Sequence, residues 1–166
     1  MSLYHKSDIG QGGIISKIEY ISSEDSQSVT YGYIHLRLCN TSKETLETTF
    51  NNNYDGNDPV YVFSGSNYNI SGNKDTWVPF EFNLENFKYD GSKNLIVEVG
   101  WTGCSEAGLY NYVFNTNGIH TIYAYNQTVN ANEAQYSLTT ANMIRLTIEY
   151  TNIEYTSLGV LKSLYR

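Results

Sequence analysis

The residue types with the clearest chemical potential occur along residues 29–39, where VTYGYIHLRLC alternates aromatic and charged side chains with apolar ones. Side chains on a strand point alternately to its two faces, so Ile34, Leu36 and Leu38 would face a core. The aromatic and charged side chains would then form a row on the opposite face. Sugars present flat apolar C–H faces ringed by hydroxyl groups, which bind aromatic rings flanked by polar donors and acceptors. The sequence therefore predicts a carbohydrate-binding groove, which would consist of Tyr31, Tyr33, His35, Arg37, Tyr61 and Trp77.

The parity of their strands assigns the two tryptophans to different environments. An alternating apolar set is predicted to face the core, namely Phe80, Phe82 and Leu84. Trp77 has the opposite parity, that of Glu81, so its ring is expected to face outward. Trp101 has the parity of Val97 in a strongly apolar stretch, which predicts core packing for this ring.

Hard oxygen ligands occur close together around Gly56, at Asp55, Asn57 and Asp58. Secreted β-sandwiches often brace loops with calcium, which prefers carboxylate and amide oxygens. The same residue types are also the usual residues of turns, and the spacing of an EF-hand loop is absent. A structural calcium ion at these three residues is the only cofactor that the sequence suggests.

The chain has 2 cysteines, Cys39 and Cys104, which allow a single intramolecular pairing. Each lies at or just beyond the end of a predicted strand, so a disulfide would form if these strands were neighbours. The alternative is a pair of unbonded cysteines that act as small apolar side chains in or near the core.

Patterns of catalytic residues are missing from the sequence. It has neither the G-x-S-x-G turn nor the H-E-x-x-H helix of common hydrolases, and its 3 histidines, His5, His35 and His120, are far apart along the chain. Glu98 lies inside an apolar strand pattern and is interpreted as a partly buried structural carboxylate. We therefore expect a protein that is not an enzyme.

Short strands are the elements that must position these residues. The strongest pair lies between Trp77 and Trp101, where Asp90-Gly91 predicts the connecting turn. The predicted strands are residues 14–21, 29–39, 60–63, 80–84, 95–99, 109–115, 119–125 and 142–150. Eight or nine strands without βαβ alternation predict an all-β fold, a two-sheet antiparallel β-sandwich of jelly-roll type. We expect a flexible N-terminal lead-in at 1–13, the sandwich at 14–150 and a C-terminal tail at 151–166.

Two segments carry a resemblance to a known kind of domain, TTFNNNYDGNDPVYVFSG and WVPFEFNLENFKYDGSKNLIVEVGWTG. The shared pattern is an aromatic residue, any residue, Tyr-Asp-Gly, two residues, Asn-Leu and then apolar residues alternating with Glu. It occurs here at Phe87, Tyr89, Asp90, Gly91, Asn94, Leu95 and Glu98. The chain resembles, over about residues 5–150, an accessory β-sandwich domain of large secreted or surface proteins of bacteria, similar to carbohydrate-binding modules. The resemblance implies a non-catalytic module, secreted or at the cell surface.

Charge narrows the range of partners. The formal net charge is −7, with 17 acidic residues against 10 lysines and arginines, so a nucleic-acid backbone would be repelled. No apolar run approaches the roughly 18 residues of a membrane span. The expected partner is a glycan or a protein of the cell surface. Because tyrosine rows also stabilise sheets and suit protein contacts, a structural or protein–protein assembly domain is the alternative.

Overall fold

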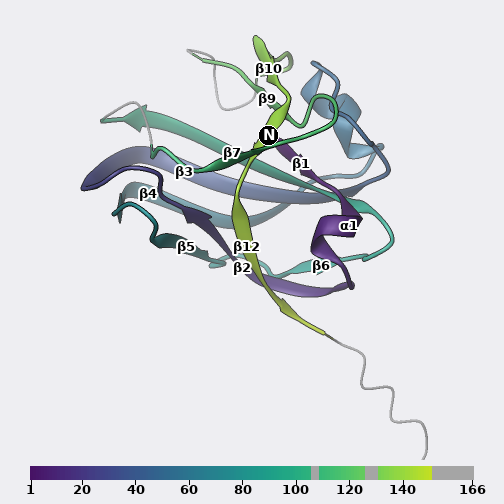
Figure 1. The fold of residues 1–166 in the computed structure, drawn as a ribbon, viewed down its shortest axis with the longest axis horizontal. Coiled ribbons are helices and arrows are strands. Elements are labelled where there is room, and N and C mark those ends of the chain that lie inside the picture. Colours follow the sequence, from purple (N-terminus) through teal and green to yellow (C-terminus); the bar gives the residue numbers. More distant parts are fainter. Residues whose placement is uncertain (106–108, 126–130, 151–166) are drawn as a thin grey trace, which may run out of the picture.

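Antiparallel strands make up most of the described chain (Figure 1). The structure, a computed structural model, describes residues 1–105, 109–125 and 131–150. In chain order the elements are β1 (Ser2–Tyr4), α1 (Lys6–Ile9), β2 (Gly13–Ile21), β3 (Gln27–Thr41), the 3-10 helix η1 (Phe50–Tyr54), β4 (Val60–Gly72), β5 (Trp77–Glu81), β6 (Phe87–Tyr89), β7 (Asn94–Cys104), β8 (Val113–Asn115), β9 (Thr121–Tyr123), β10 (Tyr136–Leu138), β11 (Thr140–Asn142) and β12 (Ile144–Glu149). The all-β class is confirmed. The expected eight or nine strands were too few, because three-residue strands are too short to show a period of two.

The strands form two sheets that pack against each other, as the sandwich prediction requires. One sheet has six strands in the order β10-β9-β1-β7-β3-β4. The other has the order β12-β2-β5, with β6 also paired to β2, and β11 and β8 form a separate two-stranded ladder. The jelly-roll connectivity of the sandwich stays a prediction.

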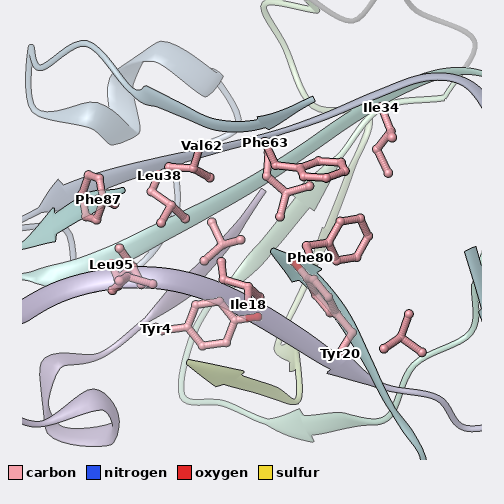
Figure 2. Packing of buried hydrophobic residues seen from close by; sticks show 14 of the residues in the cluster. Tyr4, Ile18, Tyr20, Ile34, Leu38, Val62, Phe63, Phe80, Phe87 and Leu95 are labelled. Carbon is pink, nitrogen blue, oxygen red and sulfur yellow. The ribbon is translucent and has the colours of Figure 1, made fainter. Parts of the chain in front are cut away.

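Aromatic rings from both sheets meet in the main core (Figure 2). Phe80 on β5 contacts Phe63 on β4 edge to face, with ring centroids 5.3 Å apart, and Tyr20 on β2 with centroids 5.8 Å apart. Phe82 follows β5 and is only partly buried at the margin of this core. Leu84 is 56% exposed, so its predicted core position is wrong: β5 ends at Glu81, and strand parity no longer applies beyond it.

An interruption in β3 changes which side chains face the core. Gly32 is skipped in the pairing of β3 with both neighbours, and the residues facing this gap, Asn67 on β4 and Gly103 on β7, have positive φ angles of 49° and 61°. Before the gap the odd-numbered Tyr31 is buried in the main core, whereas after it the even-numbered Ile34 is buried there. The predicted outward position of Tyr31 is therefore wrong, because an interrupted ladder reverses the parity of the strand.

The first residues of the chain belong to the larger sheet. Strand β1 pairs with β7 and β9, and the Leu3 side chain is fully buried. The prediction of a flexible lead-in is wrong for this segment, since three residues carry too little pattern to indicate a strand. The predicted tail at 151–166 lies outside the described residues.

The two cysteines do not form the predicted disulfide. They lie on the adjacent strands β3 and β7, but Cys39 faces Ile96 while Cys104 faces Tyr31. Tyr31 and Cys39 are eight residues apart on β3, which corresponds to roughly 26 Å at about 3.3 Å per residue. Both thiols are free. The strands are neighbours, as the prediction required, but the pairing register places the cysteines at opposite ends of the shared ladder.

Candidate functional site

Three rings form a row on the outer face of the larger sheet. Tyr33 and His35 come from β3, and Tyr61 comes from the neighbouring β4. The His35 ring centroid lies 5.7 Å from that of Tyr33 and 5.3 Å from that of Tyr61. Tyr61 is 43% exposed, and Tyr33 is partly exposed. We call Tyr33, His35 and Tyr61 the aromatic row. Three of the six residues predicted for the groove thus belong to the aromatic row, and a fourth, Arg37, lies beside it.

His35 is the buried centre of the aromatic row. It pairs across the ladder with Gly100, and a Cβ atom at Gly100 would lie 2.5 Å from Cε1 of the imidazole. The glycine therefore leaves the space that the ring occupies. His35 is only 2% exposed, and neither ring nitrogen has a hydrogen-bond partner among the residues that the structure describes. Its Nε2 lies 3.9 Å from Oε1 of Glu98, too far for a direct hydrogen bond.

Arg37 is fixed beside the aromatic row by Glu98 on β7. Its Nε donates a hydrogen bond to Glu98 Oε1 over 2.9 Å, and its guanidinium carbon lies 5.3 Å from the Tyr61 ring centroid. The Tyr54 hydroxyl donates a hydrogen bond to the other carboxylate oxygen of Glu98. The ion pair compensates the positive charge of Arg37. The arrangement thus presents a pre-positioned guanidinium with little net charge next to two tyrosine rings.

The pKa of Glu98 shows how strongly its neighbours stabilise the ionised carboxylate. Burial alone would raise its pKa, but the Arg37 guanidinium and the hydrogen bond from the Tyr54 hydroxyl outweigh burial and hold the pKa of Glu98 well below its ordinary value. The predicted burial of the Glu98 carboxylate is confirmed, since Glu98 is only 7% exposed. Its pairing with Arg37 was missed, because the sequence alone does not fix the register between β3 and β7.

Trp77 does not join the aromatic row, contrary to the predicted groove. It lies on β5 in the other sheet and is partly buried. The Arg145 guanidinium carbon lies 4.8 Å from its ring centroid, and Arg145 donates hydrogen bonds of 2.6 and 2.8 Å to the carboxylate of Glu19. Parity placed the ring outside the core, but it could not show that β3 and β5 belong to different sheets.

Trp101 is another ring whose predicted environment was wrong. It was expected in the core, yet it is 40% exposed and meets the Tyr31 ring edge to face with centroids 6.2 Å apart. It has the parity of the core residues of β7, but parity sets only the face of a sheet. Whether a second layer covers that face depends on the packing of the two sheets.

The predicted calcium ligands lie around the end of η1. The Asp55 carboxylate accepts a hydrogen bond from the Ser42 hydroxyl over 2.7 Å and one from the Thr41 hydroxyl over 3.2 Å, and Asn57 donates to the Tyr54 carbonyl oxygen. Asp58 is exposed. In the described part of the chain no three His, Cys, Asp or Glu side chains gather closely enough to hold a metal ion. The Asp55 carboxylate thus already ties this loop to the end of β3.

The calcium site stays a prediction, and thermal melting tests it. If Asp55, Asn57 and Asp58 bind calcium, EDTA will lower the melting temperature, and excess calcium will restore it, because a ligand that binds only the folded state stabilises that state. Asp58→Asn is the informative variant: because Asp58 is exposed, the substitution removes a predicted ligand without removing a buried side chain. Equal melting temperatures with and without EDTA would contradict the predicted calcium site.

Comparison with known proteins found no match among protein-family models, curated proteins or solved structures. Within the described residues, no helix is long and apolar enough to span a membrane. The geometry of the aromatic row is therefore the basis for inferring a function.

Proposed function

We propose that this protein is a non-catalytic carbohydrate-binding module, secreted or at the cell surface, and that the aromatic row is its binding surface. The observation that carries the proposal is the placement of Tyr33 and Tyr61 on either side of buried His35, with Arg37 held beside Tyr61. Tyrosine rings offer flat apolar faces for sugar C–H groups, and their hydroxyls, like a guanidinium, can hydrogen-bond sugar hydroxyls.

The surroundings of the aromatic row suit a polymer lying across the sheet. Ser66 on β4 and Thr102 on β7 face Tyr33 in the two adjacent ladders, and both are exposed. Such small side chains leave the Tyr33 ring accessible from either side. The ion pair with Glu98 fixes the Arg37 side chain before binding, so little conformational entropy is lost when a ligand docks.

Charge favours neutral sugars as ligands. The positive charge of Arg37 is already compensated by Glu98, and the whole chain carries a net charge of −7. The net negative charge of the protein would repel an acidic polysaccharide, and the compensated Arg37 would not offset this repulsion. We therefore expect neutral glycans to bind more tightly than uronate-containing or sulfated ones.

A glycan array and pull-down on insoluble polysaccharides test this function. We expect saturable binding to one class of neutral sugar, weakened about tenfold or more by Tyr61→Ala or Tyr33→Ala, as for the central residues of other binding surfaces. Tyr110→Ala is the matched control, since Tyr110 is 52% exposed and lies outside the aromatic row. All three variants should retain the wild-type melting temperature. If no glycan or polysaccharide binds, the proposal is contradicted and a structural or protein–protein assembly domain is favoured.

A further inference from the structure

A cavity beside β12 lies apart from the proposed sugar site. It has a volume of about 610 Å³ and shares no residue with the aromatic row. Its apolar lining includes Ile144, Leu146 and Ile148 from β12, together with Tyr4 from β1 and Phe114 from β8. Open apolar cavities of this size on a small domain commonly mark a place where another segment binds.

Strand β12 forms the edge of its sheet next to this cavity. Among the described residues it pairs only with β2, so one side of its backbone has no ladder partner there. Ile144, Leu146 and Ile148 are only partly buried although they face Tyr20, Ile18 and Ile15 of the core across the ladder. An edge strand with a half-covered apolar row is a template for one more extended segment.

The chain itself supplies a segment at this place. The described residues end at Tyr150, which lines the cavity, and residues 151–166 follow, with the sequence TNIEYTSLGVLKSLYR. At about 3.3 Å per residue, six residues of this segment would match the roughly 20 Å length of the six-residue β12, so the segment is long enough to run beside the whole strand. Its apolar side chains are Ile153, Tyr155, Leu158, Val160, Leu161, Leu164 and Tyr165.

Charge also favours this segment as the occupant. It holds two of the 10 basic residues, Lys162 and Arg166, and one of the 17 acidic residues, Glu154, so its net charge is +1. Residues 1–150 therefore carry the remaining −8. The charged side chain lining the cavity is that of Asp8. Opposite charges favour docking of the segment onto the rest of the domain.

We propose that residues 151–166 turn back within the same chain and cover the cavity beside β12, with their apolar side chains over Ile144, Leu146 and Ile148. The covalent link to β12 makes this docking intramolecular, so it competes effectively with any partner in solution.

Hydrogen exchange of the full chain and of a variant truncated after Tyr150 tests the proposal. We expect truncation to lower the exchange protection of the β12 amides by about tenfold or more and to raise the fluorescence of the apolar dye ANS. The double variant Leu161→Asp/Leu164→Asp should reproduce both effects in the intact chain, whereas Ser157→Asp/Ser163→Asp, the matched control, should not. The melting temperature of each variant checks that the sandwich stays folded.

Two results would overturn the proposal. One is β12 protection and ANS fluorescence that are the same in the full chain, the truncated chain and the leucine variant. The other is protection that appears only with a doubled mass in light scattering, because a second copy would then supply the segment. Neither result would affect glycan binding by Tyr33 and Tyr61, so failure of this proposal is distinct from failure of the sugar site.

Discussion

Glu98→Gln is expected to lower the free energy of unfolding at pH 7 by about 3 kcal/mol. The substitution keeps the shape of the side chain but removes the charge that pairs with Arg37, whose side chain is 18% exposed and lies beside Tyr61 and Tyr54. An unpaired guanidinium in this position would retain its desolvation cost without compensation. Urea unfolding measures the change.

The same variant should change the acid sensitivity of the protein. The pKa of Glu98 is about 2 in the folded protein against an ordinary value of 4.5, so the carboxylate stabilises the fold fully above pH 4.5. This stabilisation is lost as the pH falls from 4.5 towards 2. The difference between the wild type and Glu98→Gln should therefore shrink over that interval. A difference that stays constant from pH 7 to pH 2.5 would contradict the assigned ion pair.

Glu81→Gln is the matched control for this experiment. Glu81 lies on β5 with its side chain largely exposed, and its carboxylate is 3.6 Å from Lys17 Nζ. Exposed ion pairs contribute about 0–1 kcal/mol, so this variant should unfold nearly as the wild type does. Equal effects of the two substitutions would show that Glu98 has no special role.

Phe80→Ala is expected to lower the free energy of unfolding by about 3–5 kcal/mol. The Phe80 ring is buried between the sheets and makes edge-to-face contacts with Phe63 and Tyr20, so its removal leaves a cavity at the centre of the main core. Leu84→Ala is the control, because Leu84 was assigned to the same face from sequence but is exposed. Chemical denaturation should show a change of less than about 0.5 kcal/mol for this control.

If Leu84→Ala destabilised the protein as strongly as Phe80→Ala, the end of β5 at Glu81 would be misplaced. If neither variant had an effect, the two sheets would not pack through Phe80. Both results can be separated from any effect on sugar binding, because neither residue belongs to the aromatic row.

Alternation of side chains was sufficient to predict the all-β class and the positions of β2 and β3, whereas β4 and β7 extend well beyond the predicted residues 60–63 and 95–99. Residues such as Ile34 and Phe80 face the core as their parity indicates. Alternation mispredicts the environments of Tyr31, before the interruption at Gly32, and of Leu84, beyond the end of β5, because parity holds only along an unbroken strand. It also failed for β1, whose three residues pair in the middle of the larger sheet without any period in the sequence.

The candidate site was predicted only in part. Tyr33, His35, Arg37 and Tyr61 come together because β3 and β4 are long neighbouring strands, whereas Trp77 lies on the other sheet. Glu98 and Gly100 were absent from the predicted groove, since their roles depend on the register of β7 against β3. A carboxylate and a glycine in an apolar strand are signals of unusual packing, but only the ladder identifies their partners.

Nuclear magnetic resonance of the tyrosine rings tests the central claim most directly. With the neutral sugar identified on the array, titration should shift the aromatic resonances of Tyr33 and Tyr61 along one saturable curve, while those of Tyr110 remain in place. Such shifts would locate the ligand on the aromatic row. Saturable shifts confined to other residues, such as Trp77, with Tyr33 and Tyr61 unchanged, would contradict the proposed binding surface.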